Sequence, residues 1–118
     1  EYTGLKVNFI VSGDDSKIEQ YIVYSLYRMV QETLTNIQKH AQANEVTVDL
    51  RIYENGVSIQ ITDNGIGFDI KTQANKHKTI NSCFGLWGLK ERVEILKGRF
   101  DMHSEPGKGT DLIIYIPL

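Results

Sequence analysis

A hairpin pattern in the middle of the chain most constrains its fold. Residues 45–53 alternate apolar and polar side chains, residues 57–62 alternate again, and Glu54-Asn55-Gly56 between them is a tight-turn sequence. Alternation with a period of two puts apolar side chains on one face of a strand, and a short turn containing glycine joins two such strands antiparallel. The chain is therefore built around a β-sheet with a buried face.

The segments on either side of the hairpin predict further strands. Residues 5–11 alternate before they become fully apolar, residues 99–104 are a strand candidate, and residues 110–117 have a mostly apolar centre. Turn residues close the first segment, and Glu105-Pro106-Gly107-Lys108-Gly109 separates the last two. With the hairpin, these segments predict a sheet of about five strands.

Two other segments have the apolar spacing of helices. The first begins between Ser16 and Ile22 and ends near His40, and Ser16-Lys17-Ile18-Glu19 matches a capping box. The second covers residues 89–96 and is stopped by Gly98. The apolar stripe of the first helix consists of Ile22, Leu26, Met29, Val30, Leu34 and Ile37. Since each helix needs only one apolar face, the order of elements predicts an α+β two-layer sandwich. Its mixed five-stranded sheet would carry about three helices on one face.

Length and composition predict one globular domain. The chain has 118 residues, 41% hydrophobic and 24% charged, which suffices to bury a core without a disulfide or structural metal. A single cysteine, Cys83, cannot form an internal disulfide and suits a reducing compartment. A net charge of −2 gives no basic surface for nucleic acid, and no apolar run reaches the length of a membrane span. Because the chain opens at Glu1 almost directly into a strand pattern, we expect residues 1–118 to be a fragment of a longer protein.

The segment Asp63-Asn64-Gly65-Ile66-Gly67 is a first candidate for a ligand site. It places a carboxylate at the end of a strand, and its glycines allow backbone conformations closed to other residues. A carboxylate beside such a turn can hold a small ring by hydrogen bonds. The same residues also serve as plain turn chemistry in hairpins, so the motif alone leaves both interpretations open.

The first helix carries a second candidate. Glu32, Asn36 and His40 recur every four residues and share one side of the helix, with Lys39 one turn beyond Asn36. Carboxylate and amide oxygens are ligands that hard cations such as Mg²⁺ use together with phosphate oxygens. The alternative is a solvated polar face, and the spacing does not decide between the two.

A long polar stretch and two glycine pairs are the remaining candidates. Residues 69–84 contain few apolar side chains, and loops of this length are commonly functional lids or disordered insertions. Gly85 and Gly88 precede a helix, where free amides favour a phosphate, although they could equally form a hinge. Gly107 and Gly109 precede a strand, and their role could be no more than that of a hairpin turn. The sequence has neither a P-loop nor a dinucleotide fingerprint.

Four short blocks nevertheless occur together in one order. They are Glu32-x-x-x-Asn36-x-x-Lys39-His40-Ala41, Asp63-Asn64-Gly65-Ile66-Gly67, Gly85-Leu86-x-Gly88-Leu89 and Gly107-x-Gly109-Thr110. They resemble the N, G1, G2 and G3 boxes of the GHKL ATPase superfamily, over nearly the whole chain. Within this resemblance, residues 26–32 and 88–92 look like the catalytic, ATP-binding domains of bacterial sensor histidine kinases, in the branch with nitrate-response-type regulators.

The resemblance implies a Bergerat fold with an ATP lid and a role for each motif. Asp63 would accept a hydrogen bond from the adenine amino group, Gly67 would line the ring site, and Thr110 would help through a water molecule. Asn36 would bind Mg²⁺, and Glu32 would orient a metal-bound water.

The remaining implied residues would contact the phosphates or form the end of the lid. Lys39 or His40 would face the phosphates, and the end of the lid would offer backbone amides to the triphosphate. The full implied ATP-binding set is Asn36, Lys39, His40, Asp63, Gly65, Gly67, Gly85, Leu86, Gly88, Leu89 and Thr110, and the implied catalytic pair is Glu32 and Asn36.

The reaction implied is transfer of the ATP γ-phosphoryl group to a histidine on a separate dimerisation domain, with ATP and Mg²⁺ as cofactors. The implied partners are that domain of the same parent protein and a downstream response regulator, without nucleic acid or direct membrane contact. The parent would be a homodimer and this domain cytoplasmic, whether or not the parent is anchored in a membrane. Two alternatives stay open: a GHKL serine kinase of the anti-sigma type, and a nucleotide-binding module without catalysis.

Overall fold

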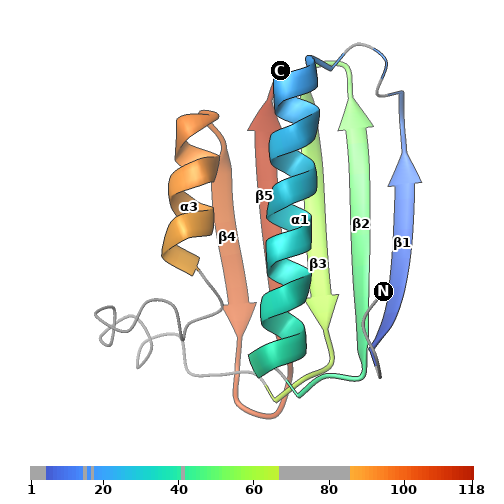
Figure 1. Cartoon of the computed structure of the whole chain (residues 1–118), viewed down its shortest axis with the longest axis vertical. Helices are drawn as coiled ribbons and strands as arrows, with labels where there is room; N and C mark the ends of the chain where they lie inside the picture. Colours follow the sequence, from blue (N-terminus) through green and yellow to red (C-terminus); the bar gives the residue numbers. More distant parts are fainter. Residues whose placement is uncertain (1–4, 15, 17, 41, 67–85) are drawn as a thin grey trace.

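A five-stranded sheet forms one layer of the molecule, and two helices lie on one of its faces (Figure 1). The computed structural model describes residues 5–14, 16, 18–40, 42–66 and 86–118. The strands are β1 (Lys6–Ser12), β2 (Glu45–Tyr53), β3 (Gly56–Asp63), β4 (Arg99–Ser104) and β5 (Thr110–Pro117), and the helices are α1 (Gln20–His40) and α3 (Leu86–Ile95).

The sheet is mixed and has the order β1-β2-β3-β5-β4. Strands β1 and β2 are parallel, and α1 is the crossover that such a pair requires. The other neighbours are antiparallel. In the predicted hairpin Tyr53 pairs with Gly56, so Glu54-Asn55 is a two-residue loop. The α+β sandwich and the mixed five-stranded sheet are therefore confirmed.

The number of helices and one cap differ from expectation. We expected about three helices, whereas the described residues contain two, which match the two apolar stripes in the sequence. The expected lid, residues 69–84, lies outside the described residues. The predicted capping box at Ser16 is wrong, because α1 begins at Gln20 and the Glu19 carbonyl accepts its first hydrogen bonds, from Ile22 and Val23. The Ser16 amide instead donates to Asp14 Oδ1 at 2.9 Å.

The end of α3 also differs from expectation. The residue in the left-handed conformation is Lys97, with φ 61°, and not Gly98. The Gly98 amide donates to the Val93 carbonyl at 2.8 Å and the Lys97 amide to the Glu94 carbonyl at 2.9 Å. These two bonds form a Schellman motif, in which Gly98 is the second residue after the cap residue Leu96.

The core lies between α1 and the sheet. The whole predicted stripe of α1 is buried, together with the inward side chains of β3 and β5. Side chains with no exposed surface are Met29, Val46, Val48, Val57, Ile59, Val93, Ile114 and Ile116. Burial at this density is the main source of stability for such a fold.

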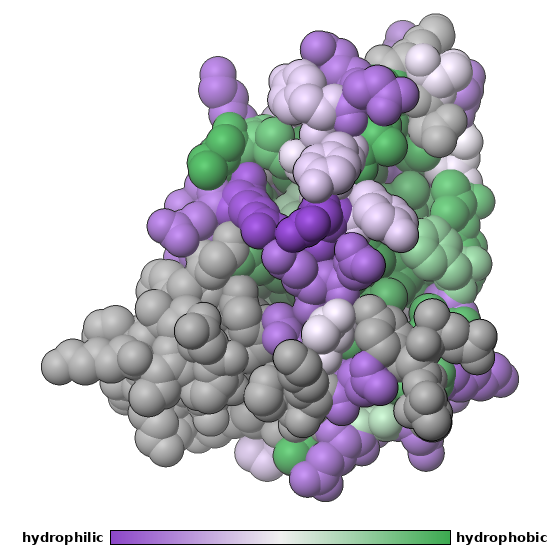
Figure 2. All heavy atoms as spheres, in the orientation of Figure 1, coloured by the Kyte–Doolittle hydropathy of each residue, from purple (hydrophilic) through white to green (hydrophobic). Residues whose placement is uncertain are grey.

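The cover is uneven across the sheet. Helix α1 crosses the middle of the sheet and α3 lies over β4, while neither helix covers β1 (Figure 1). Hydrophobic side chains are visible beside α1, over β1 and β2 (Figure 2). A groove of about 340 Å³ lies between α1 and these strands, and Phe9, Tyr27 and Leu50 are among its lining residues. The edge strand β1 is thus the least covered part of the sheet.

Candidate functional site

Asp63 ends β3 and is one of two buried polar side chains among the described residues. It is 6% exposed, and the β3–β5 register places it opposite Thr110. The Gly65 amide donates to Asp63 Oδ1 at 2.8 Å. Burial raises the pKa of the Asp63 carboxyl above its usual value, although hydrogen bonds from the backbone of Gly65 and Thr110 act in the opposite direction. Asp63 is therefore a carboxylate with little access to solvent and a fixed direction.

A small cavity adjoins this carboxylate, where both helices meet the sheet. Its volume is about 20 Å³. Its lining residues are Thr33, Ile37, Ile61, Asp63, Leu89, Met102, Thr110 and Leu112. Apolar walls with one carboxylate suit an apolar ring that carries an N–H donor. A volume of this size holds one water molecule, so a ring enters only if lining side chains move apart.

Two turns hold Asp63 in place. The first contains Gly109, whose φ of 78° lies in the left-handed region and where a Cβ would overlap the Asp63 carbonyl oxygen. The same turn is joined to the residues after β3, since the Gly107 amide donates to the Ile66 carbonyl at 2.6 Å. The Gly107-x-Gly109-Thr110 block thus has a structural role, which is to bring β5 against the end of β3.

Asn64 fixes the other side of this loop. Its Oδ1 accepts hydrogen bonds from the amides of Asn44 and Glu45, both at 3.1 Å, and its backbone amide donates to the Glu45 carbonyl. The loop after Asp63 is therefore tied to the start of β2. Sequence reasoning treated Asn64 only as a turn residue, and no local pattern indicates a bond to a strand twenty residues away.

Glu32 and Asn36 lie one turn apart on α1, on a side that includes contacts to α3. The Glu32 carboxylate accepts a hydrogen bond from Arg92 Nη1 of α3, and Arg28 Nη2 lies 3.8 Å from its second oxygen. Asn36 is half-buried. The predicted polar face of the helix is thus partly a helix–helix contact, which the helical period alone could not show.

The donor set fits Mg²⁺ only in part. Carboxylate and amide oxygens are suitable hard ligands, and Mg²⁺ typically takes one or two of these together with phosphate oxygens and water. The residues that the structure describes contain no group of three His, Cys, Asp or Glu side chains able to hold a metal. A magnesium ion here would therefore take most of its ligands from phosphate oxygens and water, and few from side chains.

The other predicted residues lie on the same side of the fold as Asp63, or they lie outside the described residues. Lys39 and His40 belong to the last turn of α1, and Leu86 and Gly88 to the first turn of α3. Leu89 is buried and lines the cavity, and Thr110 faces Asp63 across the sheet. Gly67 and Gly85 lie outside the described residues.

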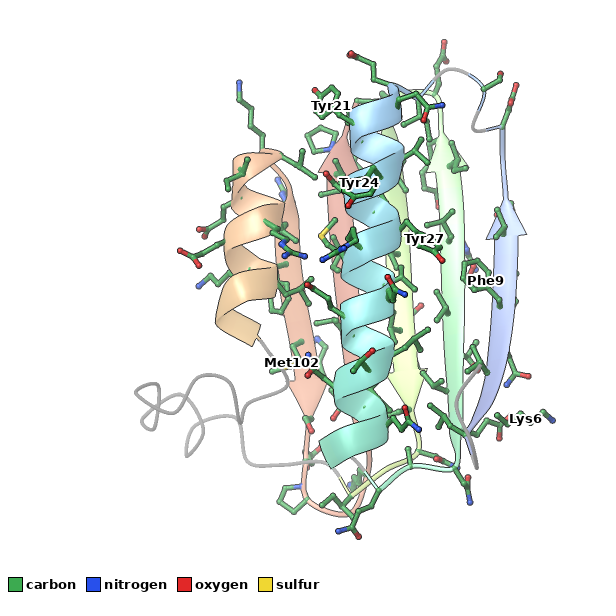
Figure 3. The ribbon with its side chains drawn as sticks, viewed as in Figure 1. Lys6, Phe9, Tyr21, Tyr24, Tyr27 and Met102 are labelled. Atoms are coloured by element: carbon green, nitrogen blue, oxygen red, sulfur yellow. The ribbon has the colours of Figure 1, made fainter. Side chains whose placement is uncertain are left out.

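Five residues of the cavity wall were not predicted as part of the site: the core residues Ile37, Ile61 and Leu112, and two others, Thr33 and Met102. Thr33 is buried in α1 and donates its hydroxyl to the Met29 carbonyl at 2.8 Å. Met102 lies on β4 beside α3 (Figure 3). A threonine within the apolar stripe of α1 was the available indication for the first, and the alternation of β4 for the second.

The comparison with known families agrees with this geometry. The model of the family described as histidine kinase-, DNA gyrase B-, and HSP90-like ATPase matches residues 23–118, and the chain belongs to this family. This confirms the family that the four sequence blocks predicted.

Similar proteins are named as histidine kinases. The signal transduction histidine-protein kinase/phosphatase DegS of Bacillus subtilis is 38% identical over the whole of this chain, which covers 31% of DegS. The oxygen sensor histidine kinase NreB of Staphylococcus carnosus is 30% identical over 98% of this chain, which covers 32% of NreB. The chain thus spans about a third of the length of these relatives.

Solved structures share the fold. The histidine kinase domain of a blue-light activated histidine kinase from Erythrobacter litoralis superimposes with a TM-score of 0.71 at 21% identity. The match covers 99% of this chain and 53% of that one. The likeness at this identity concerns the fold alone. Neither described helix combines the length and hydrophobicity that crossing a bilayer requires.

Proposed function

We propose that this chain is the ATP-binding catalytic domain of a sensor histidine kinase. The observation that carries the proposal is Asp63, a buried carboxylate that faces an apolar cavity at the end of β3. Membership in an ATPase family and similarity to two named histidine kinases support it.

Asp63 would recognise the adenine ring. Its Oδ1 is already held by the Gly65 amide, so the carboxylate keeps one direction, and the amino group on the adenine ring would meet an acceptor that needs no rearrangement. Thr110, opposite Asp63 in the sheet, would complete this end of the site with its hydroxyl, which lies 2.9 Å from Ser104 Oγ. The apolar wall formed by Leu89, Ile61 and Met102 would cover the ring.

The helix α1 would serve the phosphate end. Asn36 would offer its amide oxygen to Mg²⁺, and Glu32, one turn earlier, would orient a metal-bound water. When bound, Mg²⁺ supplies charge neutralisation on the phosphates. Lys39 or His40 in the last turn of α1 would face the phosphates, and the amides at the start of α3, from Leu86 to Leu89, would contact the triphosphate.

The proposed reaction is transfer of the γ-phosphoryl group to a histidine imidazole outside this chain. Such a transfer depends on positioning and charge stabilisation, and little covalent work is needed from the domain. The proposed acceptor lies on a dimerisation domain of the same parent, and a response regulator would receive the phosphoryl group from it. We place this domain in the cytoplasm and its parent in a homodimer.

Nucleotide binding is tested first, by calorimetry with ATP and Mg²⁺. Asp63→Asn should lose most of the affinity, because the adenine contact is buried and directional. Asn36→Ala should mainly remove the part of the affinity that depends on Mg²⁺. Asp101→Asn is the matched control, since Asp101 is 67% exposed on β4. If neither Asp63→Asn nor Asn36→Ala weakens binding relative to the unchanged chain, the nucleotide site is assigned wrongly.

The acceptor is tested with γ-labelled ATP and a histidine-containing helical domain of the parent. A phosphohistidine is labile in acid, whereas the phosphoserine made by an anti-sigma-type kinase is stable in acid. Acid-labile label on the helical domain is the expected result. Acid-stable label, or nucleotide binding without any transfer, would replace the proposal by one of the two alternatives.

A further inference from the structure

One contact between the two helices has no role in the function described so far. Arg92 Nη1 of α3 donates to Glu32 Oε1 of α1, sixty residues away in the sequence. The two side chains are 41% and 42% exposed, so solvent reaches the pair. The carboxylate that would orient a metal-bound water is therefore held by an arginine from the opposite helix.

A second arginine lies near the same carboxylate but does not hold it. Arg28 Nη2 is 3.8 Å from Glu32 Oε2, which is beyond hydrogen-bond distance. The Arg28 guanidinium instead lies 6.0 Å from the centre of the Tyr24 ring, on the N-terminal half of α1 (Figure 3). Arg92 rather than Arg28 thus determines the direction of the Glu32 carboxylate.

The pair also connects the two helical walls of the cavity. Leu89, one turn before Arg92 on α3, lines the cavity, and so does Thr33, next to Glu32 on α1. Asn36 follows Glu32 by one turn of α1. The bond between Glu32 and Arg92 therefore holds the Glu32 side chain, which is proposed to act at the phosphate end of the site. The same bond links α1 to α3.

We propose that Arg92 is a positioning residue for the nucleotide site, acting through Glu32. This rests on the proposed function, because it assigns Arg92 to the metal-dependent part of ATP binding. The planar guanidinium holds Glu32 Oε1 and so limits the directions that the carboxylate can take on the surface of α1.

This pair should contribute little to the stability of the fold. Half-exposed ion pairs contribute little to the free energy of unfolding, since solvent screens them and two side chains lose entropy. Variants of Arg92 should therefore fold, and their effect on nucleotide binding can be measured directly.

The experiment measures the affinity for ATP with and without Mg²⁺ in this chain, and takes the ratio of the two dissociation constants. The variants are Arg92→Gln, Arg92→Lys, Glu32→Gln and the double variant Arg92→Gln with Glu32→Gln. The matched control is Arg28→Gln, which removes a positive charge near the same carboxylate without removing its hydrogen bond. Thermal unfolding of each variant separates a loss of folding from a loss of positioning.

Arg92→Gln should reduce the gain from Mg²⁺ by about tenfold, which corresponds to about 1.4 kcal/mol. Arg92→Lys should restore part of it, because lysine keeps the charge but not the planar fork. Arg28→Gln should stay within about twofold of the unchanged chain, as expected for an exposed ion pair. In the Glu32→Gln background, Arg92→Gln should have no further effect, because its only route to the site is then already lost.

Two results would overturn the proposal. One is equal loss from Arg92→Gln with and without the Glu32→Gln change, which would mean that Arg92 acts independently of Glu32. The other is an unchanged Mg²⁺ ratio in Arg92→Gln. If the unchanged chain binds no ATP, the proposed function fails. If Asp63→Asn abolishes binding while Arg92→Gln leaves the ratio intact, only the role of Arg92 fails.

Discussion

The two halves of the sheet differ in how they are covered. Strands β3, β5 and β4 lie under α1 and α3, and Ile59 and Ile114 there have no exposed surface. The edge strand β1 lies beyond the helices, and three of its consecutive residues, Phe9, Ile10 and Val11, are 52% to 55% exposed. Its neighbour β2 is covered only in part, since Val46 and Val48 have no exposed surface. The sheet is thus continuous in hydrogen bonding but not in packing (Figures 1 and 2).

The candidate site lies entirely in the covered half. A buried carboxylate such as Asp63 requires fixed hydrogen-bond partners around it, because an unpaired polar group in the interior is costly. The loop after β3 supplies one partner through Gly65, and the neighbouring strand β5 supplies another through Thr110. The candidate site thus lies where both helices cover the sheet, while the edge strand β1 completes the sheet with more of its surface exposed.

Truncation of a helix-facing side chain to alanine should have the largest difference in effect between the two halves. Ile59→Ala in β3 should lower the free energy of unfolding by about 2 to 5 kcal/mol, because it leaves a cavity in the core. Val11→Ala in β1, on the same face of the sheet as Ile59, should cost less than about 1 kcal/mol, since more than half of that side chain already contacts water. Denaturation by urea with a common m-value measures both.

Equal losses for the two variants would contradict the comparison. They would mean that β1 is packed as closely as β3 in solution. A covering element from outside the described residues would then be required over the groove that Phe9 lines.

Two glycines in the covered half should give a smaller difference in the free energy of unfolding. Gly109 and Gly107 both have a left-handed backbone, with φ of 78° and 81°. A methyl group at Gly109 would overlap the Asp63 carbonyl oxygen, whereas at Gly107 it would meet nothing within 4 Å. Gly107→Ala should cost about 1 kcal/mol for the strained backbone. Gly109→Ala should cost about 2 kcal/mol more, because β5 must move away from Asp63.

Calorimetry on the same two variants adds a functional measurement. ATP affinity should fall in Gly109→Ala, which shifts the backbone opposite Asp63, and should remain in Gly107→Ala. A loss of affinity in Gly107→Ala equal to that in Gly109→Ala would show that the whole turn, rather than its contact with Asp63, is what the site requires.

The strands were predictable from the sequence because their pattern is local. The alternation of residues 45–53 identifies β2 with both ends correct, and the turn sequence after Tyr53 identifies its pairing with β3. The buried stripe of α1 follows from helical spacing in the same way. In each case one face of the element is decided by residues two, three or four positions apart.

Contacts between distant segments were not predictable. The bond from Arg92 to Glu32 depends on how α3 packs against α1, and the ties from Asn64 depend on how β2 begins. The left-handed residue after α3 is Lys97 although glycine is the usual choice, because the Schellman bonds and the packing of Gly98 against β5 decide it. The motifs therefore indicated where the site lies, while its supporting bonds required the structure.

The smallest expected effect concerns the charge of Asp63 itself. Burial raises the pKa of this carboxyl above 3.8, the usual value that the unfolded chain restores. A folded state that binds the proton more tightly is favoured by acid, so the chain should gain stability relative to Asp63→Asn as the pH falls through the raised pKa. The gain should be complete below pH 3.8, and above the raised pKa the difference between the two proteins should be constant. Urea denaturation of both proteins at several pH values measures this difference, in which all other titrating groups cancel.

A loss of stability relative to Asp63→Asn on acidification would contradict this prediction. It would mean that the hydrogen bonds from Gly65 and Thr110 outweigh burial, and that the covered half stabilises the ionised carboxylate.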